Sequence, residues 1–230
     1  MRKFVIMWFL IGIVFSQNPA IEMAKANELY QKEQFSMAIE IYQNLVDNGY
    51  VSDALFYNLG NCYHRNGEFG KAIANYYRAL ELNPTDEDVK FNLYHTRLKT
   101  RDYVEVPKPS IAIRGFEQIR TMFSKQQWLF FLQISTLLGI LVFFARKLTF
   151  GRFRLLRWIF RINLIFVLFL GGFWLANIIY FSTNDAGAIV EPAVAIFSEP
   201  SEFGTHIATV HDGLEIELLK TQSGWLEVRL

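Results

Sequence analysis

Hydrophobic residues follow different spacings in successive parts of this chain. A short apolar run occupies residues 4–15, and apolar positions then recur at three- to four-residue intervals over 20–101, as in helices buried on one face. Two long apolar runs follow at 128–145 and 162–181, and the last part of the chain alternates apolar and polar residues. The pattern predicts a mainly α-helical protein with a small all-β segment at 182–230.

The two long apolar runs are typical of a transmembrane helical hairpin. Residues 128–145 and 162–181 contain no ionised side chain, and runs of 18 and 20 residues suit helices that cross a hydrocarbon core. The absence of acidic and basic residues within the runs argues against a transport component. Small or polar residues are expected where the two helices meet: Gly139, Gly171, Gly172 and Asn177.

Charge is strongly segregated, although the formal net charge is only +1. Residues 111–161 hold nine basic side chains and one acidic one, whereas residues 182–230 hold two basic and eight acidic ones. Residues 146–161 contain six basic residues and no acid, and the positive-inside rule places such a loop in the cytoplasm. Both flanking parts are then predicted to lie outside. Nucleic-acid binding is not expected, because the basic residues flank apolar runs and form no single face.

The start of the chain is typical of an export signal. Arg2 and Lys3 precede a 12-residue apolar run, and the small residue Ser16 follows it. That run is too short for an ordinary membrane span, so residues 1–16 are predicted to be a signal peptide. The alternative is an uncleaved anchor. The signal peptide would send residues 20–101 outside the cytoplasm, in agreement with the basic loop.

An internal repeat occupies the helical part, in which matching residue types recur at one constant offset. The second copy resembles the tetratricopeptide repeat (TPR) consensus, which implies pairs of antiparallel helices stacked into an α-solenoid over 20–101. The first copy is weaker, with Leu29 in an aromatic position, Glu33 where the turn usually has glycine, and Tyr50 where proline is usual. The consensus residues of the second copy are Phe56, Leu59, Gly60, Tyr63, Gly67, Phe69, Ala72, Tyr76, Ala79 and Pro84.

A further helix is expected to cap the repeats. Thr85 and Asp88 predict a capping box at its start, and the helix is expected to run to about Arg101. Leu93 and Leu98 would lie on its inner face. Isolated repeats need neighbours to bury their apolar faces, so this helix would complete the stack.

The TPR resemblance implies a groove that binds a peptide or protein segment. Asn27 and Asn58 are separated by the same interval as Asn61 and Asn92, the relation found between groove asparagines that hold a peptide backbone in the family. The basic residues of the family's carboxylate clamp are missing, so recognition of a free C-terminal carboxylate is not expected. Ordinary helix surface is the alternative interpretation. The residues placed in the groove are Met23, Asn27, Tyr30, Tyr57, Asn58, Asn61, His64, Arg65 and Asn92.

Two segments beyond the repeats allow more than one interpretation. Residues 102–127 are predicted to be either an interfacial amphipathic helix or a simple linker that follows Pro107 and Pro109. Residues 182–230 resemble the bacterial SH3-like domain but lack the strand that normally closes its barrel. Such domains bind peptides or wall polymers in some relatives. Core packing is the favoured role of Trp225, and aromatic contact with such a ligand is the alternative.

The residue types that support catalysis do not come together in this sequence. No metal-ligand spacing, nucleophile motif or phosphate-binding loop is found, so the protein is predicted to be no enzyme and to hold no cofactor or metal. The single cysteine, Cys62, is expected to be a buried helix residue, and it excludes an intramolecular disulfide.

The order of signal peptide, TPR segment, membrane hairpin and SH3-like segment resembles the Bacteroides aerotolerance (Bat) family. The resemblance implies a bacterial inner-membrane protein with periplasmic ends, working beside Bat proteins with von Willebrand factor A domains and a MoxR-type ATPase. It favours a periplasmic adaptor for protein partners in a stress or envelope complex. The rival hypothesis is an envelope sensor whose SH3-like segment binds peptidoglycan.

Overall fold

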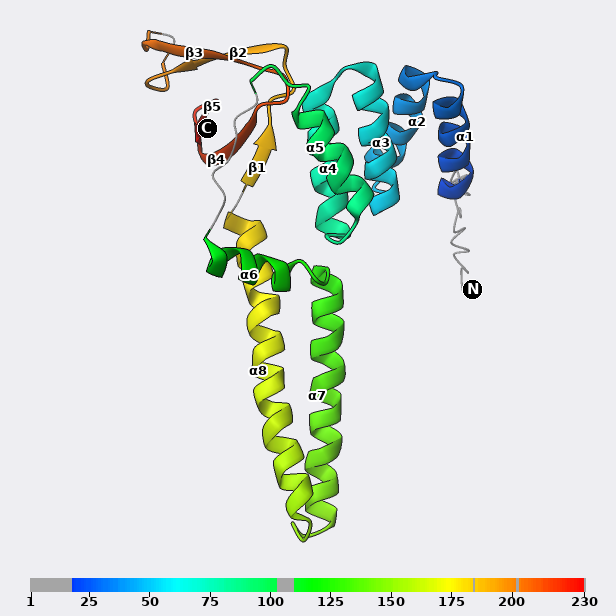
Figure 1. Ribbon diagram of the computed structural model, residues 1–230, viewed down its shortest axis with the longest axis vertical. Coiled ribbons are helices and arrows are strands. Elements are labelled where there is room, and N and C mark those ends of the chain that lie inside the picture. The colour runs from blue at the N-terminus through cyan, green and yellow to red at the C-terminus, as the bar shows by residue number, and fades with distance from the viewer. Residues whose placement is uncertain (1–17, 103–109, 184, 202, 230) are drawn as a thin grey trace, which may run out of the picture.

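The computed structural model describes residues 18–102, 110–183, 185–201 and 203–229. Within these residues the protein is mainly helical, with eight helices and five strands. Figure 1 shows three parts: a group of short helices, a long helical hairpin that extends away from it, and a small β-module. The predicted signal peptide, residues 1–16, lies outside the described residues.

The five short helices form the helical module, and each packs against the next along the chain. The turns between them lie where the repeat pattern predicts. Gly67, between the two helices of the second pair, takes the left-handed conformation with φ 82°. Glu33 occupies the equivalent turn of the first pair with φ 59°, a conformation that disfavours a side chain. The helices are α1 (Pro19–Gln31), α2 (Phe35–Asp47), α3 (Asp53–Asn66), α4 (Phe69–Leu82) and α5 (Glu87–Arg97).

The start and end of α5 differ from the sequence prediction. Its N-cap is Asp86, whose carboxylate accepts hydrogen bonds from the backbone N–H of Asp88 at 3.0 Å and of Val89 at 3.1 Å. The predicted capping box from Thr85 is therefore wrong. The helix ends at Arg97, and Leu98 is half exposed rather than on the inner face.

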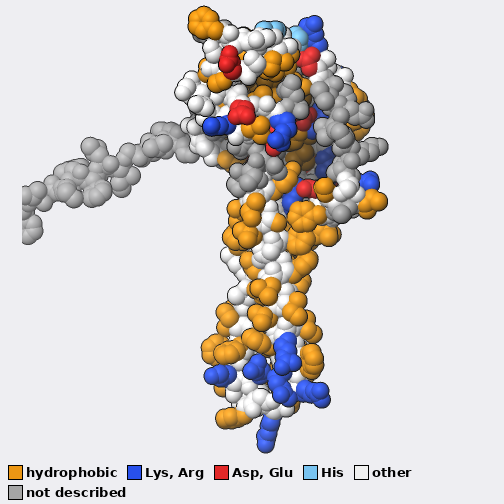
Figure 2. Space-filling view, turned by 90° about the vertical axis from the view of Figure 1, so that its left-hand side faces the viewer, with side chains coloured by type: hydrophobic (Ala, Val, Ile, Leu, Met, Phe, Trp, Pro, Cys, Tyr) orange, Lys and Arg blue, Asp and Glu red, His pale blue; other side chains and the backbone are white. Residues whose placement is uncertain are grey.

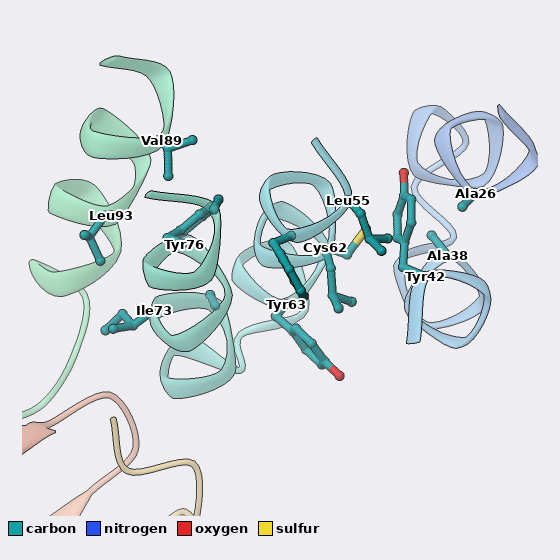
Figure 3. Packing of buried hydrophobic residues seen from close by; sticks show 14 of the residues in the cluster. Ala26, Ala38, Tyr42, Leu55, Cys62, Tyr63, Ile73, Tyr76, Val89 and Leu93 are labelled. Atoms are coloured by element: carbon teal, nitrogen blue, oxygen red, sulfur yellow. The ribbon is translucent and has the colours of Figure 1, made fainter. Parts of the chain in front are cut away.

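The core of the helical module runs through all five helices (Figure 3). Small residues stand where helices cross, with Ala26, Ala38 and Ala72 fully buried. Gly60 is the tightest crossing, because a Cβ atom there would lie 2.8 Å from ring carbons of Tyr76. Cys62 is fully buried, as predicted, and burial raises the pKa of its thiol to about 12.

The hairpin consists of α7 (Lys125–Leu148) and α8 (Arg154–Thr183), two helices long and apolar enough to cross a membrane. Both extend beyond the predicted runs, so most of the segment 146–161 is helical and only residues 149–153 form the turn. The basic residues there continue the helices instead of ending them.

One polar contact fixes the two long helices against each other. The Asn163 side chain donates to the backbone oxygen of Ser135 at 3.1 Å and to its hydroxyl at 3.0 Å. Gly139 makes room for it, since a Cβ atom there would lie 2.3 Å from Asn163 Oδ1. Asn177, the predicted interhelical donor, donates instead to Phe173 O of its own helix. Gly172 has open space around it and contributes no close approach.

A short helix, α6 (Ile111–Arg120), lies across the upper end of the hairpin (Figure 1). Phe116 stacks on Phe173 of α8 with ring centroids 5.6 Å apart. The indole N–H of Trp128, at the start of α7, donates to Arg120 O at 3.1 Å. The segment that the sequence predicts as either an amphipathic helix or a linker thus contains a helix packed on the hairpin.

The β-module contains five strands in two antiparallel sheets. The order of strands in the larger sheet is β1-β4-β5, and β2 pairs with β3 in the smaller one. Phe197 of β2 and Trp225 of β5 meet edge to face between the sheets, with ring centroids 5.8 Å apart. The strands are β1 (Asp185–Ala188), β2 (Ala193–Phe197), β3 (His206–His211), β4 (Glu215–Gln222) and β5 (Trp225–Arg229).

The β-module is docked on the α4 and α5 end of the helical module. Glu215 pairs with Arg97, whose Nη2 lies 2.8 Å from the carboxylate, and it also accepts a hydrogen bond from the Tyr77 hydroxyl. Burial and the Glu215 charge raise the pKa of Tyr77, so its phenol stays protonated and donates. Asp212 accepts from the Gly70 backbone N–H at 3.0 Å. This interface joins segments that are far apart in the sequence.

Candidate peptide-binding groove

The first helices of the successive pairs, α1, α3 and α5, carry the residues that the sequence analysis places in a groove. A cavity of about 240 Å³ lies among them. Six of the predicted residues line it: Tyr30, Tyr57, Asn61, His64, Arg65 and Asn92. Tyrosine, amide, imidazole and guanidinium groups give this cavity a polar lining that can hydrogen-bond to a peptide.

The two predicted asparagine pairs are in direct contact. Asn58 Nδ2 donates to Asn27 Oδ1 at 3.0 Å, and Asn92 Nδ2 donates to Asn61 Oδ1 at 2.9 Å. Each accepting oxygen is also held by a tyrosine hydroxyl one helix away: Tyr42 donates to Asn27 at 2.5 Å. The equivalent bond from Tyr76 to Asn61 is 2.8 Å long. The spacing that the two asparagine pairs share therefore produces the same bonded unit twice.

These bonds fix the orientation of the amide groups. Asn61 Oδ1 accepts hydrogen bonds from Tyr76 and Asn92. Asn61 Nδ2 makes no hydrogen bond within the described part of the chain. Asn92 uses its nitrogen for Asn61 and for the Tyr57 hydroxyl at 3.2 Å, which leaves its oxygen as an acceptor. One donor and one acceptor are thus presented side by side, the pair that a peptide backbone requires.

His64 is held as a neutral imidazole at the edge of the cavity. The Thr96 hydroxyl donates to Asn92 O at 2.7 Å, so it accepts from His64 Nδ1–H at 2.7 Å. His64 Nε2 then accepts from the Lys99 ammonium at 3.1 Å. Burial lowers the pKa of His64, and the positive charges of Lys99 and Arg65 lower it further.

This arrangement predicts a loss of stability in acid. A histidine whose pKa is lowered by folding favours the folded state when neutral, so its contribution is present above the ordinary pKa of 6.5 and is lost as pH falls through that value. The midpoint temperature of thermal unfolding should therefore fall between about pH 7.5 and about pH 5.5, and it should fall by a few degrees more in wild type than in His64→Gln. His206→Gln in the β-module is the control and should behave as wild type. Equal declines in wild type and His64→Gln would contradict the assignment.

The structure also changes the predicted set of residues. Met23 packs against the core of the helical module and does not line the cavity. Asn27 and Asn58 form the first bonded pair, and they do not line the cavity either. Tyr76 and His95 line it and are absent from the sequence prediction. His95 follows His64 by the same interval that separates Asn92 from Asn61, so the sequence does contain a signal for it.

The comparison with known families agrees with part of this description. The tetratricopeptide repeat family model matches residues 54–86, which contain nearly all of α3 and all of α4. The repeat supports a role in protein–protein interaction, and domains of this kind are typically non-enzymatic adaptors. A search of the curated proteins finds no match to the chain.

Proposed function

We propose that this protein is a membrane-anchored adaptor that holds an extended segment of a partner protein in the groove of its helical module. The paired asparagines carry this proposal, because they present a donor and an acceptor to the cavity from two successive first helices. The weaker first copy and α5 extend the matched repeat on both sides, so we treat all five helices as one TPR array. Residues 20–101 form that array in the proposal.

The exposure of the hairpin supports the membrane anchor. Only 17% of the most apolar part of α7 and 11% of that of α8 are buried within the protein. A core helix of a soluble protein would be mostly covered by its neighbours, whereas Figure 2 shows apolar side chains along the length of the hairpin. A hydrocarbon environment would cover them, with spans close to 128–145 and 162–181.

The distribution of charge supports one orientation of the anchor. Basic residues gather at the far end of the hairpin (Figure 2), which we place in the cytoplasm. The helical module and the β-module are docked on each other at the opposite end, so both occupy the same side, outside the cytoplasm. In this arrangement α6 lies at the membrane surface with Ile111, Ile113 and Ile119 exposed toward lipid.

Crosslinking in native membranes followed by mass spectrometry tests the groove. We expect Asn27→Ala, Asn61→Ala and Arg65→Ala together to reduce the yield of specific crosslinked partners by tenfold or more, because several hydrogen bonds to the ligand are lost at once. The matched control changes three exposed residues outside the groove: Asn44→Ala, Asn48→Ala and Arg101→Ala. An unchanged partner list for a folded, inserted groove variant would contradict the proposal.

The partners that we propose follow from the resemblance to the Bat family. They are membrane proteins with von Willebrand factor A domains that act with a MoxR-type ATPase, in a stress or envelope complex of a bacterial inner membrane. Recovery of such proteins by the wild-type groove, and not by its variant, would support this part of the proposal.

A cavity in the β-module favours a second candidate function. It has a volume of about 550 Å³ and lies between the two sheets. Its lining combines Phe197, Trp225 and aliphatic residues with polar and charged ones, among them Glu199, Lys220 and Glu227. We propose an SH3-like module here as the alternative, a sensor that binds peptidoglycan. Retention of the full-length protein on purified peptidoglycan, lost in Trp225→Ala, would favour the sensor over the adaptor.

A further inference from the structure

The far end of the hairpin concentrates positive charge. This cationic tip, residues 146–161, contains the last turn of α7, the connecting turn and the first two turns of α8. Backbone bonds close the turn tightly: Phe150 N–H donates to Lys147 O at 3.1 Å and Gly151 N–H to Arg146 O at 2.9 Å. The six cations of the tip are Arg146, Lys147, Arg152, Arg154, Arg157 and Arg161.

These cations are not neutralised by the protein itself. No acidic residue lies within the tip, and no salt bridge involves its six basic side chains in the part of the chain that the structure describes. Three of the cations lie over aromatic rings instead: Arg146 over Phe160 at 5.4 Å, Lys147 over Phe143 at 5.7 Å and Arg161 over Trp158 at 5.4 Å. Arg152, Arg154 and Arg157 are exposed.

Large apolar side chains are interspersed with these cations. Phe150 is 96% exposed and Leu148 is 79% exposed, and Phe153, Leu155 and Trp158 are exposed beside them. A surface made only for an acidic soluble partner has no need of so many exposed aromatic and aliphatic groups. Alternating cations and aromatic rings suit the zone where lipid headgroups meet acyl chains.

We propose that the cationic tip binds the phosphate headgroups of anionic phospholipids, with Arg152, Arg154 and Arg157 as the main ligands. Guanidinium groups pair with phosphate oxygens in a bidentate manner, and Phe150 and Phe153 insert between the headgroups. This inference rests on the proposed membrane anchoring and adds a lipid class to it. It also fixes the depth of the hairpin at the cytoplasmic surface.

Native mass spectrometry of the detergent-solubilised full-length protein tests the inference. The protein is titrated with phosphatidylglycerol or with phosphatidylcholine, and the affinities for the two lipids are compared. We expect wild type to prefer phosphatidylglycerol, and Arg152→Gln, Arg154→Gln and Arg157→Gln together to lower its affinity for that lipid about a hundredfold. Each cation near an anionic headgroup contributes about fivefold.

A matched variant controls for the loss of three charges. Lys25→Gln, Lys90→Gln and Arg101→Gln remove three exposed cations, two from the helical module and one from the turn after α5. They should leave the lipid preference unchanged. The preference of wild type should also weaken as salt is raised, a test that needs no variant. Equal affinity of wild type for both lipids, or an unchanged preference in the tip variant, would overturn the inference.

Failure of the anchoring proposal would look different. A protein that leaves the membrane fraction on alkaline extraction would contradict the anchor itself, and the lipid inference with it. A protein that stays inserted but shows no preference for phosphatidylglycerol would contradict only the lipid inference. Loss of a crosslinked acidic protein from the tip variant, with its lipid preference unchanged, would assign the tip to a protein partner instead.

Discussion

Replacing Gly60 by leucine is expected to unfold the helical module. A Cβ atom at this position would lie 2.8 Å from two ring carbons of Tyr76 and 3.3 Å from Ala72 O. Tyr76 is 1% exposed and its hydroxyl is bonded to Asn61, so the ring cannot move aside. Helices α3 and α4 must separate, at a cost of about 3 kcal/mol or more. Chemical denaturation followed by far-UV circular dichroism measures the change.

Gly115→Ala is the control for this substitution. Gly115 also lies in the middle of a helix, and a Cβ atom there would have no neighbour within 4 Å. Alanine at this position should therefore be neutral or slightly stabilising. The Gly60 variant should also lose partner binding, because Asn61 and Tyr76 leave their positions together. A Gly60→Leu protein as stable as wild type would mean that the two helices do not cross as described.

Replacing Gly70 by leucine is expected to detach the β-module while both modules stay folded. A Cβ atom on Gly70 would lie 1.9 Å from Ile189 O, a backbone atom, and 2.5 Å from Asp212 Oδ1. The docked arrangement cannot tolerate this contact, since the backbone at Ile189 must move as a whole. The Glu215 carboxylate would then leave Arg97 and Tyr77, a loss of charge-assisted hydrogen bonds worth about 1.5–3 kcal/mol each before exposure to solvent is considered.

The internal repeat offers a matched control for this variant. Ser36 stands one repeat before Gly70, at the same place in α2, and it is exposed with no β-module against it. Ser36→Leu should therefore leave the structure unchanged. Hydrogen exchange of α4 and of β4 measures docking: both should exchange faster in Gly70→Leu only. Equal protection in Gly70→Leu and wild type would refute the interface.

Local patterns predict the elements of this protein better than their ends. The pattern around Gly60, Ala72 and Tyr76 identifies a helix pair, because small residues are required where the two helices cross and a large one fills the space beside them. The helices of the hairpin are longer than predicted. Hydropathy alone ends each apolar run at a charged residue, whereas Arg146 and Arg157 favour helix and continue it. Asp86 displaces Thr85 as the N-cap because either residue type can fill that role, and only the path of the chain decides between them.

The residues of the candidate groove could be predicted where their spacing repeats along the sequence. They could not be predicted where they depend on contacts between different helices. Asn61 and Asn92 share a fixed spacing, and so do His64 and His95. Tyr76 belongs to the consensus core, and nothing in its position along the chain shows that its hydroxyl reaches Asn61. The contacts of Glu215 with Arg97 and Tyr77 join residues of common surface types across 118 and 138 positions, and no local pattern marks them.

The docking of the β-module sets an order of events in biogenesis. Asp212 and Glu215 reach α4 and α5 only after the intervening hairpin has been synthesised, so this interface closes last. It can form only if the chain after α8 lies on the same side of the bilayer as the helical module. In a bilayer, a chain whose second long helix failed to cross would keep the two modules apart and leave Arg97 without its carboxylate. On the proposed anchoring, the finished interface thus marks a molecule in which both long helices have crossed the bilayer.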